Sequence, residues 1–179
     1  MTNINNKFPR HFKDFIIELN KHQVEYTLIG GYALGAYGHI RATADLDIYI
    51  NATEENARKM LKVCIAYGIP SHTIKKDMFL VPKMIGIGKP PLRIEIIKKL
   101  DVLDFKYAFS QAIKTLVDGV SIYVMNIDDL ILLKKAAIKG RNKSRDSEDL
   151  SYLEKLNVFQ RKKKVEKFPL NITNRMAHL

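Results

Sequence analysis

The chain of 179 residues has few cysteines that could form disulfides or bind zinc, and it has no long apolar run that could anchor it in a membrane. Its single cysteine, Cys64, excludes an intramolecular disulfide framework and a zinc site built from cysteines. Such cysteine usage is typical of a reducing compartment, so we expect a cytoplasmic protein. No apolar run approaches the roughly 20 residues that a membrane span needs, and the charged N-terminal segment predicts no signal peptide. We therefore expect no membrane partner.

Acidic residues are scarce relative to basic ones. The sequence has 30 Lys and Arg against 19 Asp and Glu, which gives a net charge of +11. Residues 141–179 hold ten basic and five acidic residues, so the last quarter of the chain carries nearly half of the excess. Charge of this sign bears on association rather than on fold, and it favours a polyanionic partner or substrate.

Apolar periodicity predicts strands in the first two thirds of the chain and helices after them. Helices are expected over residues 9–22, 32–37, 53–67, 104–114 and 126–139, and again after Ser144. Strands are expected over residues 24–29, 45–50, 78–87, 92–97 and 120–124. This order of elements indicates an α+β fold.

The densest chemical signal is a pair of aspartates on one strand. Residues 45–50 alternate strictly, so Asp45 and Asp47 share a face and lie about 7 Å apart at the usual rise. Aspartate is disfavoured in strands, and two like charges on one face repel each other. A divalent cation would remove that cost, and hard oxygen ligands suit Mg²⁺ or Mn²⁺. On its own, however, such a pair is more often the solvated face of an edge strand.

Two further features strengthen the signal. The pair Gly30-Gly31 ends a predicted strand and opens a short helix, which favours an anion such as a triphosphate at the free backbone amides. The segment is neither a G-x-G-x-x-G motif nor a P-loop, and two glycines alone are only a turn. Glu95 lies in the middle of a predicted strand, where it could simply pair with Arg93. If this strand neighbours that of Asp47, three carboxylates converge, and such a set can hold two metal ions that clamp a nucleotidyl transfer.

Together these motifs resemble the nucleotidyltransferase superfamily built on the DNA polymerase β-like catalytic fold. Residues 30–47, Gly-Gly-x-Ala-x4-Gly-x2-Arg-x-Thr-x-Asp-x-Asp, are similar to small bacterial members, including toxin-type enzymes of abortive-infection systems and relatives of aminoglycoside nucleotidyltransferases. The similarity continues in residues 128–137 and 145–150, so it spans most of the chain. The chain departs from many members in having Gly-Gly for Gly-Ser and Glu for the third Asp.

The resemblance implies an architecture. It indicates a mixed β-sheet with flanking helices and a C-terminal helical segment. Residues 1–125 would form the catalytic core, and residues 126–160 would add helices that complete the site. Residues 161–179 are basic and show little periodicity, so we expect a loosely held tail.

The resemblance also implies roles for the motif residues. Asp45 and Asp47 would ligate metal, and Glu95 would be a third carboxylate that helps to hold metal or acts as a base. The residues implied to bind the nucleotide and its phosphates, or to line the facing wall, are Gly30, Gly31, Arg41, Thr43, Lys134, Asp146 and Asp149.

The implied activity is the Mg²⁺- or Mn²⁺-dependent transfer of a nucleoside monophosphate from a nucleoside triphosphate, such as ATP, to an acceptor hydroxyl, with release of pyrophosphate. The acceptor could be RNA such as a tRNA end, a protein hydroxyl or a small molecule, and an antitoxin-like protein is a candidate partner. The alternatives are a catalytically silent nucleotide- or RNA-binding module of the same fold and a basic RNA-binding domain whose acids are structural.

Several candidate residues have simpler explanations. Lys134 could occupy the solvated side of an amphipathic helix, and Asp146 suits the first turn of a helix in any case. Nothing in the sequence positions His39 as a base or a ligand. The basic run over residues 161–164 is most often a solvated face or tail.

Overall fold

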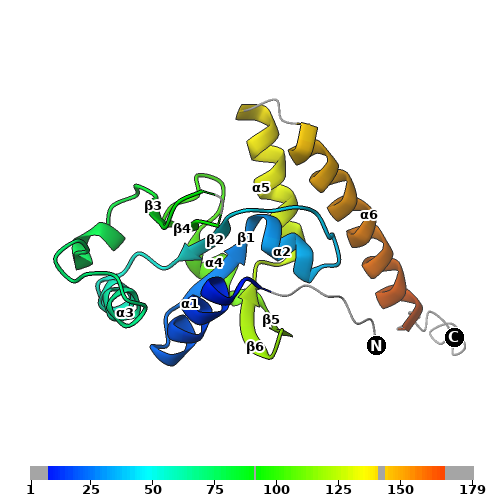
Figure 1. Ribbon diagram of the computed structural model, residues 1–179. Helices are drawn as coiled ribbons and strands as arrows, with labels where there is room; N and C mark the ends of the chain where they lie inside the picture. The colour runs from blue at the N-terminus through cyan, green and yellow to red at the C-terminus, as the bar shows by residue number, and fades with distance from the viewer. Residues whose placement is uncertain (1–7, 91, 141–143, 168–179) are drawn as a thin grey trace, which may run out of the picture.

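The computed structural model describes residues 8–90, 92–140 and 144–167. In this part of the chain one six-stranded sheet has the order β3-β4-β2-β1-β6-β5 and is flanked by helices (Figure 1). Its strands are β1 (Tyr26–Ile29), β2 (Leu46–Ile50), β3 (Ile85–Ile87), β4 (Ile94–Ile97), β5 (Ile113–Val117) and β6 (Val120–Val124). Strand β1 is antiparallel to β2 and parallel to β6, and β2 is parallel to β4. The mixed sheet with flanking helices agrees with the α+β class expected from the sequence.

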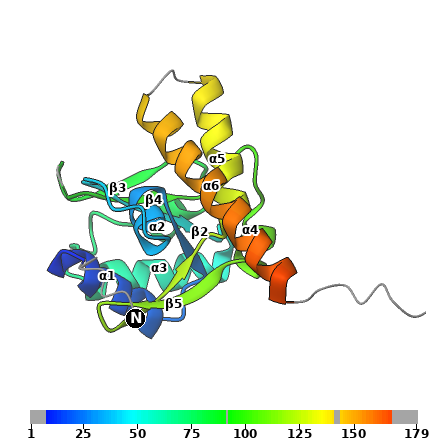
Figure 2. The ribbon, with the colours of Figure 1, turned by 90° about the vertical axis from the view of Figure 1, so that its right-hand side faces the viewer.

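The helices follow from apolar stripes and capping residues. They are α1 (Arg10–Lys21), α2 (Gly30–Ala36), α3 (Glu54–Ala66), the 3₁₀ helix η1 (Lys76–Phe79), α4 (Phe105–Ser110), α5 (Ile127–Gly140) and α6 (Ser144–Lys167). The predicted cap of α3 is confirmed, because the Thr53 side chain accepts a hydrogen bond from the backbone N–H of Asn56. Helices α1 and α3 contact each other on one side of the sheet (Figures 1 and 2).

Strand β2 has one fully buried face and one that is buried in part. Leu46, Ile48 and Ile50 are fully buried on one face. On the other face the ring of Tyr49 packs edge-on against Phe105 of α4, and its hydroxyl donates a hydrogen bond of 2.9 Å to the carbonyl of residue 103. The aspartates that precede Tyr49 on this second face stay partly exposed. The tyrosine therefore closes one end of the face and leaves the other to the carboxylates.

Helices α5 and α6 pack against each other as a hairpin on the side away from α1 and α3 (Figures 1 and 2), and Leu130 and Leu153 join it to the core. Helix α6 continues to Lys167, so the first part of the expected tail, residues 161–167, is helical. The rest of that tail, residues 168–179, lies outside the described residues. Within the described ranges, no helix is both long enough and apolar enough to cross a membrane.

Two predicted elements were wrong in extent. The helix predicted over residues 104–114 ends at Ser110, and β5 follows it and pairs with β6. The signal overlooked is Asp118-Gly119, whose φ angles of 49° and 78° make the two-residue hairpin turn for which this dipeptide is suited. The strand predicted over residues 78–87 is reduced to β3, because η1 occupies its start and Pro82 has no N–H for a sheet.

Candidate active site

Three carboxylates lie together where β2 and β4 run side by side. In the parallel register of these strands Asp47 stands opposite Glu95. Asp45 precedes β2 by one residue, and its Oδ1 accepts a hydrogen bond of 3.2 Å from the backbone N–H of Arg93. The condition left open by the sequence, that the strand with Glu95 neighbours the strand with Asp47, is met.

The electrostatics of Asp47 reflect this crowding. Burial is the main cause that raises the pKa of its carboxyl from 3.8 to about 7, and the charges of Glu95 and Asp45 raise it further. The ammonium of Lys134 on α5 acts in the opposite direction, so this lysine lies close enough to influence the cluster. The site is therefore a pocket of excess negative charge within a basic protein.

The glycine pair lies directly against these carboxylates. Gly30 has a φ of +65°, and a Cβ built on it would overlap the Oδ2 of Asp47. A Cβ on Gly31 would overlap the Oγ1 of Thr43. Both glycines are thus required by close packing, and Gly30 also by its left-handed backbone. The turn brings bare backbone and the Thr43 hydroxyl to the edge of the carboxylate cluster.

A second cluster joins the loop before β2 to the helical hairpin. The carboxylate of Asp149 on α6 has no exposed side-chain surface, and it accepts hydrogen bonds from Arg41 Nε at 2.8 Å and Arg41 Nη2 at 3.0 Å. Lys134 Nζ lies 2.7 Å from Asp149 Oδ2 and 2.8 Å from Asp146 Oδ1. All four residues were predicted from the sequence as site residues, and the structure brings them into one network of ion pairs.

Asp149 differs from Asp47 in its titration. Burial acts to raise its pKa, but the hydrogen bonds and charges of Lys134 and Arg41 outweigh burial and hold the pKa below its ordinary value. The carboxylate therefore stays ionised and fixes the two cationic groups in place.

The structure adds residues that the sequence did not reveal. His39 Nε2 lies 3.2 Å from Asp149 Oδ1, and the imidazole stacks on the ring of Tyr152 at a centroid distance of 4.3 Å. The Tyr152 hydroxyl donates a hydrogen bond of 2.9 Å to the carbonyl of Tyr37. The only sequence signal was helical spacing, since Tyr152 follows Asp149 by three residues on α6.

The carboxylates lie next to one another, but two of them already have partners. Glu95 Oε1 forms an ion pair with Arg93 Nη2, and Asp45 is bound to the backbone of Arg93. Across the residues described, no group of three or more His, Cys, Asp or Glu side chains has the arrangement of a metal site. The oxygen donor set is nevertheless of the chemical type that Mg²⁺ and Mn²⁺ prefer.

The basic run over residues 161–164 lies on the last turns of α6. Arg161 pairs with Asp128 of α5 at 2.9 Å, whereas Lys162 is exposed. Lys163 Nζ lies 4.6 Å from the ring centroid of the half-exposed Phe159. The run is thus a helix surface in the described part of the chain.

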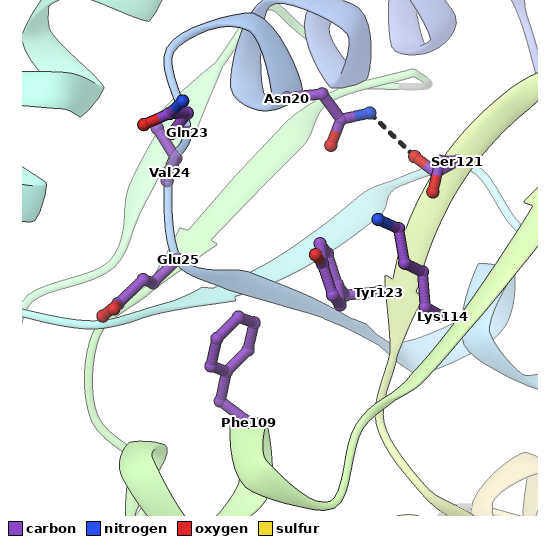
Figure 3. Close-up of a pocket in the computed structure, with 8 residues that line it drawn as sticks. All are labelled: Asn20, Gln23, Val24, Glu25, Phe109, Lys114, Ser121 and Tyr123. Atoms are coloured by element: carbon purple, nitrogen blue, oxygen red, sulfur yellow. Dashed lines mark hydrogen bonds between the residues drawn. The ribbon is translucent and has the colours of Figure 1, made fainter.

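A cavity of about 300 Å³ lies away from these clusters, at the start of β1 rather than at its end (Figure 3). Its walls include Glu25, Phe109, Lys114 and Tyr123, and the ammonium of Lys114 lies 5.4 Å from the Tyr123 ring centroid. It includes none of the residues predicted from the motifs.

Comparison with models of known protein families found no match, and comparison with curated proteins found none either. The resemblance seen in the sequence therefore stays a hypothesis.

Proposed function

We propose that the chain is a metal-dependent nucleotidyltransferase, which moves a nucleoside monophosphate from a nucleoside triphosphate to an acceptor hydroxyl and releases pyrophosphate. One observation carries the proposal: the register of β2 and β4 sets Asp47 beside Glu95, directly against the Gly30 turn. Lys134 and Arg41 reach the same region from two other elements and add cationic groups. Carboxylates, bare backbone and cations in one place are the components that phosphate transfer requires.

The chemistry of these residues suits a divalent cation. Asp45, Asp47 and Glu95 offer carboxylate oxygens, and their mutual repulsion is a cost that a cation would remove. A Cβ at position 30 would overlap the Oδ2 of Asp47, so glycine at this position lets the carboxylate lie directly against the backbone of the turn. When bound, Mg²⁺ or Mn²⁺ would neutralise the charge of the phosphates during transfer.

The chain's own residues would bind and orient the substrates. The backbone of Gly30 and Gly31 would let the phosphates approach closely, beside the hydroxyl of Thr43. Arg41 and Lys134, held by Asp149, would bind phosphate oxygens. A carboxylate oxygen of Glu95 would take the proton of the acceptor hydroxyl.

The acceptor proposed is anionic, with RNA as the first candidate. The net charge of +11 and the exposed Lys162 and Lys163 on α6 support this choice. An antitoxin-like protein partner is proposed on the resemblance alone, and so is the division into core, completing helices and tail.

The test is a transfer assay. The protein is incubated with each α-³²P-labelled nucleoside triphosphate, Mg²⁺ or Mn²⁺, and total RNA, protein extract or small-molecule extract. Asp47→Asn and Glu95→Gln should each reduce label transfer by about a thousandfold or more, since Asp47 would hold the cation and Glu95 would take the proton of the acceptor hydroxyl. Asp101→Asn, a change at a carboxylate whose side chain is 90% exposed, is the matched control and should leave transfer unchanged.

The label itself identifies the acceptor, because RNA, protein and small molecules separate easily. Transfer that persists in Asp47→Asn would contradict the mechanism. Nucleotide binding without metal dependence, and without a labelled product from any acceptor, would favour a silent binding module instead.

A further inference from the structure

Arg93 contacts two of the three carboxylates. It precedes β4 by one residue and shares a face with Glu95, whose Oε1 it pairs with through Nη2. Its backbone N–H donates the hydrogen bond to Asp45 Oδ1. No other residue in the described part of the chain contacts both of these acids through a hydrogen bond or an ion pair.

The guanidinium lies in a slot that a glycine opens. Gly86 of β3 stands opposite Glu95 in the antiparallel register of β3 and β4. A Cβ built on Gly86 would lie 3.0 Å from Arg93 Cδ and 3.5 Å from Arg93 Nε, closer to Cδ than side chains normally approach. A side chain at this position would require the arginine to shift by a few tenths of an ångström, which disfavours its present pairing with Glu95.

The arrangement leaves one donor unused. Arg93 Nε is buried and has no hydrogen-bond partner among the described residues. A buried donor without a partner costs free energy that solvation would recover. Among the described residues the guanidinium has one ion-pair partner, Glu95, so a competitor for that carboxylate would release the arginine.

We propose that Arg93 is the internal counter-ion of the carboxylate site and that a divalent cation displaces it from Glu95. The inference rests on the proposed function, because it takes Asp47 and Glu95 as cation ligands. Arg93 is then a positioning residue: it holds Glu95 beside Asp47 while the site has no cation, and it weakens cation binding by competition. Release also frees a planar fork of donors that suits a phosphate group next to the site.

The test measures the affinity for Mn²⁺ alone, by electron paramagnetic resonance of the free ion. Arg93→Gln removes the competitor, and we expect Mn²⁺ binding about tenfold tighter than in the unmodified protein. Gly86→Ala keeps the charge but displaces the guanidinium, and binding should tighten about threefold. Arg93→Lys keeps the charge without the planar fork and should fall between the unmodified protein and Arg93→Gln.

Two controls accompany these variants. Arg58→Gln removes an exposed arginine that pairs with Glu54 on α3, and it should leave Mn²⁺ affinity unchanged. Thermal unfolding shows whether each variant is folded. If Gly86→Ala does not fold, the comparison of Arg93→Lys with the unmodified protein takes its place.

The outcomes separate the two proposals. If the unmodified protein binds Mn²⁺ and Gly86→Ala or Arg93→Lys binds it no more tightly, direct competition is wrong while the cation site stands. If tightening in Arg93→Gln is matched by Arg58→Gln, the effect is one of net charge and the inference also fails. If neither the unmodified protein nor any variant binds Mn²⁺ saturably, both the proposed function and the inference are overturned.

Discussion

Two aspartates in neighbouring clusters have opposite environments. Asp47 on the sheet faces Glu95 and Asp45, and burial with these charges raises its pKa to about 7. Asp149 on the helical hairpin has no exposed side-chain surface, yet Arg41 and Lys134 hold its pKa below the ordinary value. The helical cluster is neutralised within the protein and can serve as rigid support. The sheet cluster is only partly compensated, by Arg93 and Lys134, which stabilises the fold less but suits a cation.

The largest expected effect comes from breaking the neutralised cluster. Asp149→Ala leaves Arg41 and Lys134 without their common partner, and loss of one member of a buried ion pair costs about 3 kcal/mol of stability. Urea unfolding at pH 7 measures it. Glu148→Ala, at the exposed position next to it, should stay within about 0.5 kcal/mol of the unmodified protein. Equal stability of the two variants would contradict the central role of Asp149.

The second prediction concerns pH and the sheet cluster. The folded protein binds the Asp47 proton more tightly than the unfolded chain does, so this group destabilises the fold as pH rises from about 4 through 7. In chelator, Asp47→Asn should therefore be more stable than the unmodified protein by about 2 kcal/mol at pH 8, and the gain should vanish near pH 4. Unfolding curves at several pH values measure the difference. A variant that is less stable at pH 8 would refute the crowding of these acids.

For Asp149 the sign is opposite. Its lowered pKa gives stability that is present above about pH 4, the ordinary range of the group, and is lost as pH falls through the folded value. The cost of Asp149→Ala should thus shrink at pH 3, which the same unfolding curves record. A cost that stays constant down to that pH would mean that the ion pairs contribute little.

A smaller effect is expected from adding a cation. Mn²⁺ at about ten times its dissociation constant should stabilise the unmodified protein by about 1.4 kcal/mol, since it binds the folded state alone. Asp47→Asn should show no such gain, because the sheet cluster loses a ligand. Thermal unfolding with and without Mn²⁺ measures both, and equal gains would place the cation elsewhere.

The smallest effect tests the support around Asp149. Tyr152→Phe keeps the stack on His39 but removes the hydrogen bond to the Tyr37 carbonyl, at a cost of about 1 kcal/mol. Tyr107→Phe, at a tyrosine that is 58% exposed on α4, is the matched control and should be nearly neutral. If both variants unfold alike, the bond to residue 37 does not hold the hairpin to the loop.

Much of the fold could be predicted from local patterns. The alternation of residues 45–50, the cap at Thr53 and the strand over residues 120–124 all depend on residues close in sequence. The strand β5 was missed because its pairing depends on a partner beyond the Asp118-Gly119 turn, and that short turn was not read as a hairpin. The length of strand β3 was overestimated because an apolar run does not reveal where the chain bends.

The sequence predicted which residues belong to the candidate site better than it predicted their contacts. The motif residues Asp45, Asp47 and Glu95 were chosen for their strand positions, and the parallel pairing of β2 and β4 was a condition left open. His39 could not be placed, since its partner Asp149 is 110 residues away. Arg93 was noted only as a simple partner for Glu95, and neither the slot at Gly86 nor the unpartnered Nε has a local signal.

The sequence by itself determined which residues carry charge, where the backbone needs glycine and which faces of the strands and helices are apolar. These properties depend on periodicity and on residue chemistry, which act over a few neighbours. Only the tertiary structure decided that one buried aspartate is crowded by acids and another is surrounded by cations. The physical reason is that a carboxylate's pKa and its freedom to bind a cation depend on charges a few ångströms away, which strand register and helix packing bring there.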